Sequence, residues 1–306
     1  MRPHRRWIFA ALLLALLWGA APFQGGLPLQ GGPSEAGAAA RLGSGKYTGM
    51  ILIPAGPFIM GRGNGPDEEK PAHRVFLPAF YIDQNLVTVK AYARFIQAKG
   101  PTGPKGEEYL DVFDPDARIH LKDKLWRPDE GSEMYPAAEL SWHGAVAYCR
   151  WVGKRLPSEA EWEKAARGTD GRLYPWGSGP PAPDLAFIGG HRGETVPVGR
   201  YPKGASPYGA LDMAGQVWEW TRSLYRPYPY DPKDGRESLT AEDGRVVRGG
   251  NTSSAPEEMT ATAREPVYPG RLDTGHAYYG FRCAADVELV RRRRRSLPAR
   301  LLGRGR

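Results

Sequence analysis

The stretch Leu211–Thr221 holds two acids and two tryptophans within eleven residues. Successive side chains of an extended strand point to opposite faces, so Trp218 and Trp220 share one face and Glu219 points the other way. Asp212 and Glu219, with the backbone carbonyls between them, offer the hard oxygen atoms that Ca²⁺ prefers. The alternative is a turn that enters an aromatic core strand, with both acids in solvent. The residues alone leave these two interpretations open.

Other residues with reactive side chains are scattered along the chain. The sequence contains no Ser-His-Asp order, phosphate-binding loop or His-x-x-x-His pair. It contains two cysteines, Cys149 and Cys283, and no nearby histidines that would complete a zinc site. Nothing beside either cysteine indicates an activated thiolate. In an oxidising compartment, such a pair predicts one disulfide across a long loop.

The positive charge of the chain lies in its two ends. Of 42 Lys and Arg and 34 Asp and Glu, residues 1–46 hold five bases and one acid. Residues 291–306 hold eight bases and no acid, which leaves 29 bases and 33 acids, a net charge of −4, in 47–290. A nucleic-acid-binding domain carries its basic residues on the folded surface. The charge distribution therefore argues against nucleic acid as a partner.

The N-terminal sequence predicts export. Arg2, Arg5 and Arg6 precede an apolar run over 7–23, the pattern of a signal peptide or an uncleaved signal anchor over residues 1–23. Residues 24–46 are rich in Gly, Pro and Ala and predict a flexible linker. We expect a periplasmic or extracellular protein that contacts the membrane only through an uncleaved N-terminal segment. The basic residues 291–306 predict a disordered tail, with contact to anionic lipid as the alternative.

The pattern of residues 47–290 predicts one compact α+β domain with little regular secondary structure. Capping residues mark three helices, over 89–99, 142–152 and 159–167. Short apolar or β-branched runs predict strands at 50–53, 58–61, 73–77, 80–82, 246–251 and 278–283. Residues 101–135 are charged and rich in proline, and we expect an irregular surface segment there.

Several segments resemble the formylglycine-generating enzyme family, also called the sulfatase-modifying factor domain. They occur in the family's order and are Ile53–Gly56, Met60–Gly61, Val87–Thr88, Leu156–Glu163, Trp176–Gly177, Leu211–Thr221, Arg248–Gly250 and Gly280–Cys283. The resemblance covers almost all of 47–290. It implies a fold related to that of C-type lectins.

The resemblance also implies a structural calcium ion and a disulfide. The calcium ligands fall on Asp212, Glu219 and the backbone carbonyls of Gly215 and Val217. A second calcium site of the family has no clear counterpart in residues 185–195. The disulfide joins Cys149 to Cys283.

The segment after Arg248–Gly250 departs from the family pattern. The family places two cysteines there, which bind copper(I) and engage a substrate cysteine, whereas this chain has Ser254 and Met259 at those positions. Soft thiolates are the ligands that copper(I) requires, and a hydroxyl and one thioether do not replace them. We therefore expect no copper-dependent formylglycine generation, and the sequence identifies no catalytic residue.

Four residues lie in the two loop regions that the resemblance places nearest to the family's cleft: His191, Arg264, Arg271 and His276. The arginines are suited to pairing with carboxylates or phosphates. The alternative is a solvated surface loop.

These observations lead to three expectations about function. The first is an exported protein that assists the maturation or oxidation of a partner envelope enzyme, or of a peptide, without the copper and cysteine mechanism. The second is a non-catalytic, lectin-like module that binds a glycan or a protein. The third is formylglycine generation with a substitute metal site. The sequence does not decide whether the chain is an enzyme.

Overall fold

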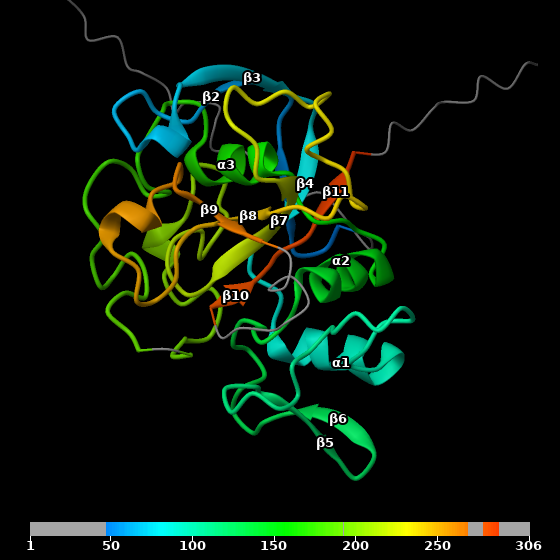
Figure 1. Ribbon diagram of the computed structural model, residues 1–306. Coiled ribbons are helices and arrows are strands. Elements are labelled where there is room, and N and C mark those ends of the chain that lie inside the picture. Colours follow the sequence, from blue (N-terminus) through cyan, green and yellow to red (C-terminus); the bar gives the residue numbers. More distant parts are fainter. Residues whose placement is uncertain (1–46, 192, 269–277, 288–306) are drawn as a thin grey trace, which may run out of the picture. The chain divides into compact units, whose positions relative to one another are not determined.

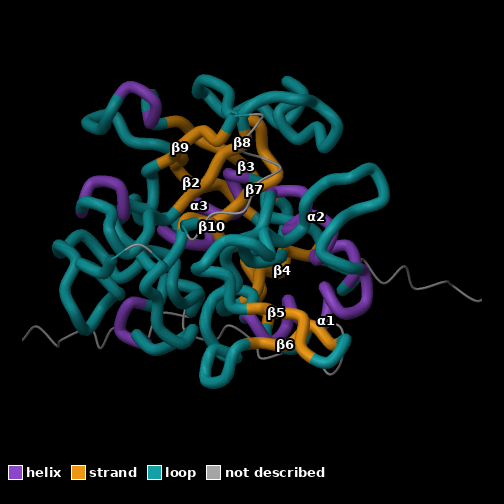
Figure 2. The backbone as a smooth tube through the Cα atoms, turned by 60° about the horizontal axis from the view of Figure 1, so that its bottom comes forward, coloured by secondary structure: helices purple, strands orange, loops and turns teal. Residues whose placement is uncertain are grey.

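The computed structural model describes residues 47–191, 193–268 and 278–287. Long loops connect short helices and strands, as Figure 2 shows. The strands are β1 (Met50–Ile53), β2 (Gly56–Met60), β3 (His73–Leu77), β4 (Phe80–Asp83), β5 (Ile119–Lys122), β6 (Leu125–Pro128), β7 (Trp218–Leu224), β8 (Arg245–Arg248), β9 (Arg264–Val267), β10 (Tyr279–Gly280) and β11 (Ala284–Asp286). The helices are α1 (Val89–Lys99), α2 (Trp142–Trp151) and α3 (Glu159–Arg167). The predicted α+β class with little regular structure is confirmed.

Four small sheets organise these strands (Figure 1). One sheet has the order β1-β4-β11 and is antiparallel, and a second has the order β10-β7-β8-β9. Strand β10 runs parallel to β7, whereas β8 runs antiparallel to both of its neighbours. The pairs β2–β3 and β5–β6 form separate two-stranded sheets. Residues 218–221 of the predicted stretch form the first part of β7, the longest strand among the described residues.

The three helices begin where the sequence predicts. The side chains of Thr88, Ser141 and Ser158 each accept a hydrogen bond from a backbone N–H in the first helical turn. Before α3, Glu161 also accepts from the backbone N–H of Ser158, which completes the predicted capping box. Helix α2 ends one residue earlier than predicted, and Val152 is partly exposed instead of lying on the buried stripe.

The prediction that residues 101–135 are irregular is wrong for 119–128. There β5 and β6 form a regular antiparallel hairpin. The two turn residues, Asp123 and Lys124, both have positive φ angles, of 53° and 64°. Such a turn matches the twist of the two strands. The usual signal for it is a glycine, which this turn lacks, so the sequence pattern does not reveal the hairpin.

The predicted disulfide between Cys149 and Cys283 is confirmed. The two Cα atoms lie 5.7 Å apart and 134 residues separate the cysteines. The bond joins α2 to the segment that leads into β11. In a chain-entropy account, closing a loop of this length stabilises the fold by about 4–5 kcal/mol.

Trp220 and Phe281 pack in the same aromatic core as α1 and α2.

Helix α3 is buried along its whole length, including its charged residues. Arg248 at the end of β8 donates to both Glu159 and Glu163. Arg264 at the start of β9 makes a bidentate pair with Glu159, with N···O distances of 2.7 and 2.9 Å. Arg167 donates to Glu163 at 3.0 Å. Two carboxylates and three guanidinium groups thus connect α3 to two neighbouring strands.

Within the part of the chain that the structure describes, no helix has both the length and the apolar composition needed to cross a bilayer. The predicted segments 1–23 and 291–306 lie outside the described residues, as does the linker over 24–46. These domain assignments remain predictions.

We expect the substitution Glu163→Gln to destabilise the fold by about 3 kcal/mol, because it removes a buried negative charge that faces two arginines. Urea unfolding followed by tryptophan fluorescence measures the loss. Glu130→Gln is the matched control, since Glu130 is exposed and belongs to no ion pair within the described residues. A loss no larger than that of the control would contradict a structural role for the network.

Candidate functional site

The segment after β8 contains positions 254 and 259, where the resemblance places two cysteines that this chain lacks. Gly249 and Gly250 have φ angles of 95° and 71°. A Cβ atom on Gly249 would lie 3.1 Å from the Trp162 ring, so both backbone conformation and space favour glycine here. Ser254 follows in a turn, where its Oγ accepts from the backbone N–H of Asn251 at 3.1 Å. The Ser254 hydroxyl is therefore part of a turn.

Met259 lies in the protein interior. Its side chain is 1% exposed and packs in a small cluster with Tyr174, Ala186 and Ala214. Met259 is thus enclosed by the core, and the Ser254 hydroxyl belongs to a turn. The absence of a copper(I) site stays a prediction.

Residues 190 and 191 lie beside this turn. The backbone N–H of Gly190 donates to the Thr252 carbonyl at 3.1 Å, and the Thr252 hydroxyl donates to the His191 carbonyl at 3.2 Å. The side chain of His191 is exposed. The structure therefore places the backbone of His191 next to the turn, and the role of its side chain in a cleft stays a prediction.

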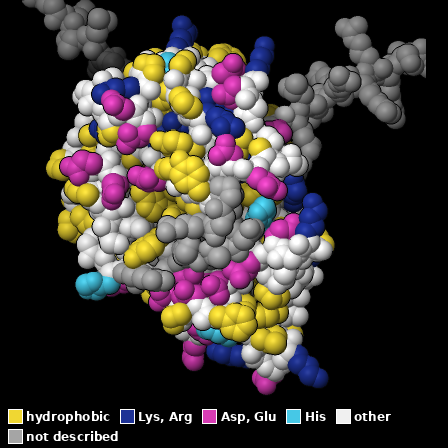
Figure 3. Space-filling view, viewed as in Figure 1, with side chains coloured by type: hydrophobic (Ala, Val, Ile, Leu, Met, Phe, Trp, Pro, Cys, Tyr) yellow, Lys and Arg dark blue, Asp and Glu magenta, His cyan; other side chains and the backbone are white. Residues whose placement is uncertain are grey.

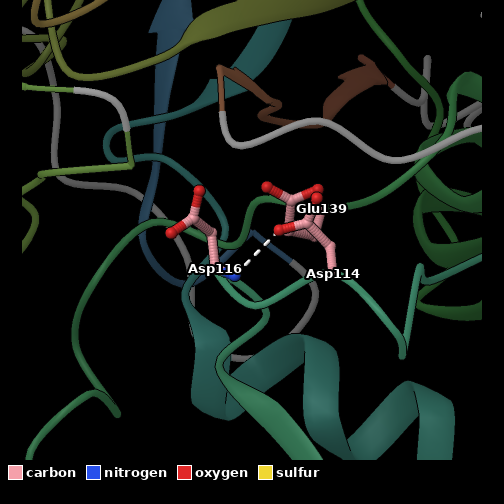
Figure 4. A group of neighbouring side chains, drawn as sticks. All are labelled: Asp114, Asp116 and Glu139. Carbon is pink, nitrogen blue, oxygen red and sulfur yellow. Dashed lines mark hydrogen bonds between the residues drawn. The ribbon is translucent and has the colours of Figure 1, made fainter.

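Close to Gly193 lies a group of three acids that no sequence motif indicates as a site. Asp114, Asp116 and Glu139 each place one carboxylate oxygen within 4.8 Å of the others. Figure 4 draws the three side chains. Glu139 is fully buried and has a φ angle of 54°. Asp114 accepts from the backbone N–H of Asp116 at 2.8 Å. A Cβ atom on Gly193 would lie about 3.0 Å from Asp116.

This acidic cluster is a possible metal-binding group, since carboxylate oxygens suit hard cations. Acidic side chains gather in the lower half of the face seen in Figure 3, below the grey atoms. A signal for the cluster is present in the sequence as the Asp-x-Asp pair at 114 and 116. The third member, Glu139, is 23 residues away from Asp116 and joins the pair only through the fold.

Asp212 fits the predicted calcium site. Its side chain is 7% exposed, and one of its oxygens accepts from the backbone N–H of Gly199 at 2.6 Å. The other oxygen is buried without a hydrogen-bond partner among the described residues. Burial raises the pKa of Asp212. A buried carboxylate oxygen without a partner is the kind of group that a cation would satisfy.

Glu219 has a different partner from the predicted one. Both of its oxygens accept from Arg282, at 2.7 and 2.8 Å. Burial raises the pKa of Glu219, and the Arg282 guanidinium opposes this effect. In the sequence, Arg282 is visible only as part of the Gly280–Cys283 motif, which indicates no partner for it. Glu219 thus already has a counter-ion, and the calcium site over Asp212, Gly215, Val217 and Glu219 stays a prediction.

The prediction that Arg264 lines the cleft needs correction. Arg264 is 3% exposed and is held by Glu159, and its guanidinium lies 4.5 Å from the Tyr225 ring and 4.2 Å from the Tyr228 ring. It supports the core, because the ion pair with α3 draws it inward. Arg271 and His276, the other two predicted cleft residues, lie outside the described residues.

The fold and the site define a class of protein: small sheets joined by long loops, one long-range disulfide, and an Arg-Gly-Gly turn beside β7. Residues 35–287 match the sulfatase-modifying factor enzyme 1-like domain. The chain belongs to this family, which also includes the formylglycine-generating enzymes.

Two curated relatives and one solved structure illustrate the similarity. Hercynine oxygenase of Mycolicibacterium smegmatis is 34% identical over 270 residues, which cover 78% of this chain and 61% of that protein. The formylglycine-generating enzyme of Streptomyces coelicolor is 33% identical over 314 residues, which cover 86% and 96% of the two chains. The structure of PvdO from Pseudomonas aeruginosa superposes with a TM-score of 0.62 at 25% identity, covering 78% and 94%. The chain thus spans less than two thirds of the hercynine oxygenase.

We expect calcium to raise the melting temperature of chelator-treated protein by about 5 °C or more at saturation, because ligand binding stabilises the folded state. Asp212→Ala should abolish the increase, and Asp116→Ala should leave it intact. Differential scanning calorimetry of the three proteins measures the effect. An increase that survives Asp212→Ala and disappears in Asp116→Ala would contradict the predicted site and move the ion to the acidic cluster.

Proposed function

We propose that this chain is an exported member of the family that assists the maturation or oxidation of another exported protein without the copper and cysteine mechanism. The proposal rests on the side chains at positions 254 and 259. At the two positions where the resemblance places the family's thiols, this chain has a hydroxyl in a turn and a buried thioether.

The cysteine content supports this proposal. The chain has two cysteines, and both belong to the disulfide between α2 and the segment before β11. No thiolate is left to bind copper(I) or to form a mixed disulfide with a substrate cysteine while that bond is intact. Export is supported by the same disulfide, which is stable in an oxidising compartment, and by the predicted N-terminal signal.

The surroundings of the turn support a role at this face of the molecule. The turn at 251–254 contacts residues 190 and 191, and Gly193 lies close to Asp116 of the acidic cluster. The cluster offers hard oxygen ligands where the family relies on soft sulfur. The calcium ion that we propose is the one predicted at Asp212, and the acidic cluster is the alternative position for it. Loops on a rigid scaffold are also where function varies within a fold.

Copper is expected to bring no activity. Titration with copper(I) should show no tight binding, and a cysteine-containing sulfatase peptide should yield no aldehyde with copper present. Mass spectrometry of the peptide measures the aldehyde. Because the double substitution Ser254→Cys, Met259→Cys restores two thiols, it should bind copper(I) more tightly than the wild type and serves as the positive control. Copper-dependent aldehyde formation by the wild type would overturn the proposal in favour of formylglycine generation with a substitute site.

A protein partner is expected in an envelope extract. The full chain should retain a specific exported protein, identified by mass spectrometry, and glycosidase treatment of the extract should not abolish its capture. Ser253→Glu places a charge on the exposed turn and should weaken capture several-fold. Lys99→Glu, at the exposed end of α1, is the control and should not. Retention of glycan with no protein partner would favour the lectin-like alternative and contradict the proposal.

A further inference from the structure

A pocket of about 620 Å³ lies on a part of the surface that the candidate site does not use. Its walls come from α2, from residues 105–109, and from the loop 239–242 together with the first residue of β8. Pockets of roughly 300–1,000 Å³ are typical of small-molecule sites. The size of this pocket fits a ligand with an organic body.

Arg245 lines this pocket and is the most deeply buried cation in its wall. Its side chain is 1% exposed, and its guanidinium lies 4.0 Å from the Trp142 ring. Its two terminal nitrogens donate to the backbone carbonyls of Arg222, Ser238 and Ala241, at 2.6–3.0 Å. The Nε atom has no acceptor among the described residues. The partners of Arg245 are therefore neutral.

The acids nearest to Arg245 are paired with other groups. Glu237 accepts from Arg222 at 2.8 Å, and Asp243 accepts from Arg226 at 2.7 Å. Burial lowers the pKa of Arg245 to about 10, which leaves the group charged at neutral pH. A buried charge is costly unless a counter-ion accompanies it. Arg245 therefore brings a positive charge to the pocket without a direct ion pair to a carboxylate among the described residues, although Glu237 and Asp243 partly offset that charge.

Exposed charges surround the mouth of the pocket. Lys105 and Arg150 belong to no ion pair among the described residues, and Glu107 and Glu242 supply the negative groups. With Arg245, three cations face two carboxylates, which leaves a surplus of one positive charge. This surplus suits a monoanion, whereas the two acids would repel the second charge of a phosphate monoester.

The rest of the lining is apolar or aromatic. Tyr109, Val146, Ala147 and Leu239 contribute side chains to the walls. These surfaces suit the carbon skeleton of a ligand, while Glu107, Glu242 and Thr240 offer acceptors for hydroxyl or amide donors. The pocket thus combines one net positive charge with an apolar wall and acceptors at the rim.

We propose that this pocket binds a small organic monocarboxylate, with its carboxylate beside the exposed Arg150 and the buried charge of Arg245 adding to the attraction from within the wall. Two sources present this chemistry: a sugar acid and the C-terminus of a peptide. The site shares none of its lining residues with the turn at 251–254 or the acidic cluster, so it stands independently of the function proposed above.

Isothermal titration calorimetry with the full chain tests the site. The probes are glucuronate for a sugar acid and N-acetyl-dialanine for a peptide terminus, with glucose and N-acetyl-dialanine amide as neutral counterparts. At least one carboxylate should bind at least tenfold more tightly than its neutral counterpart, and the better probe identifies the source. Equal binding of acid and neutral forms, no binding by either acid, or tighter binding of inorganic phosphate would overturn the proposal.

Two rim substitutions should shift the affinity for the better probe in opposite directions. Arg150→Gln removes an exposed positive charge and should weaken binding by up to about fivefold, and Glu242→Gln removes a negative charge and should tighten it by a similar factor. Arg74→Gln, on the exposed face of β3, is the control and should have no effect. Local unfolding cannot produce a tighter complex, so the Glu242→Gln result separates an electrostatic site from damage to the fold. Shifts in the same direction, or none, would contradict the proposal.

Discussion

The buried ion network around α3 is the interaction on which the arrangement of this molecule depends. Arg248 and Arg264 end or begin neighbouring strands, and both are held by Glu159 on the helix. A buried carboxylate is stable only when cations and hydrogen-bond donors surround it. The network therefore fixes how β8 and β9 lie against α3. Because the turn at 249–254 begins directly after Arg248, the same contacts set where the candidate site starts.

Two residues for which the sequence predicts a functional role belong instead to buried arginine–glutamate pairs. Glu219, a predicted calcium ligand, pairs with Arg282, and Arg264, a predicted cleft residue, pairs with Glu159. Arginine suits both roles because its planar fork binds both oxygens of a carboxylate. The positions that resemblance associates with metal or substrate thus partly serve the stability of the core. What remains accessible near the turn is His191 and the exposed loop around Ser253.

The sequence predicts features that local rules or the family pattern determine. The capping serines of α2 and α3 predict where these helices begin. The family resemblance predicts the disulfide between Cys149 and Cys283 that the structure contains. Pairings between distant residues are not visible in this way. Glu219 meets Arg282 across 63 residues, and Glu139 joins Asp114 and Asp116 only after folding. The β5–β6 hairpin escapes prediction because Asp123 and Lys124 adopt a turn conformation for which glycine is the usual sign.

The single disulfide also limits the ways in which this protein can bind a partner protein. Its two sulfurs are those of the only cysteines in the sequence, and both belong to fully buried residues. A reactive cysteine of a bound polypeptide would have to break the disulfide between α2 and the β11 segment before it could form a mixed disulfide with this chain. Any complex that keeps the fold intact must then be reversible and sensitive to dilution. Trapping with thiol-directed cross-linkers would miss such complexes, whereas amine-directed reagents would record them.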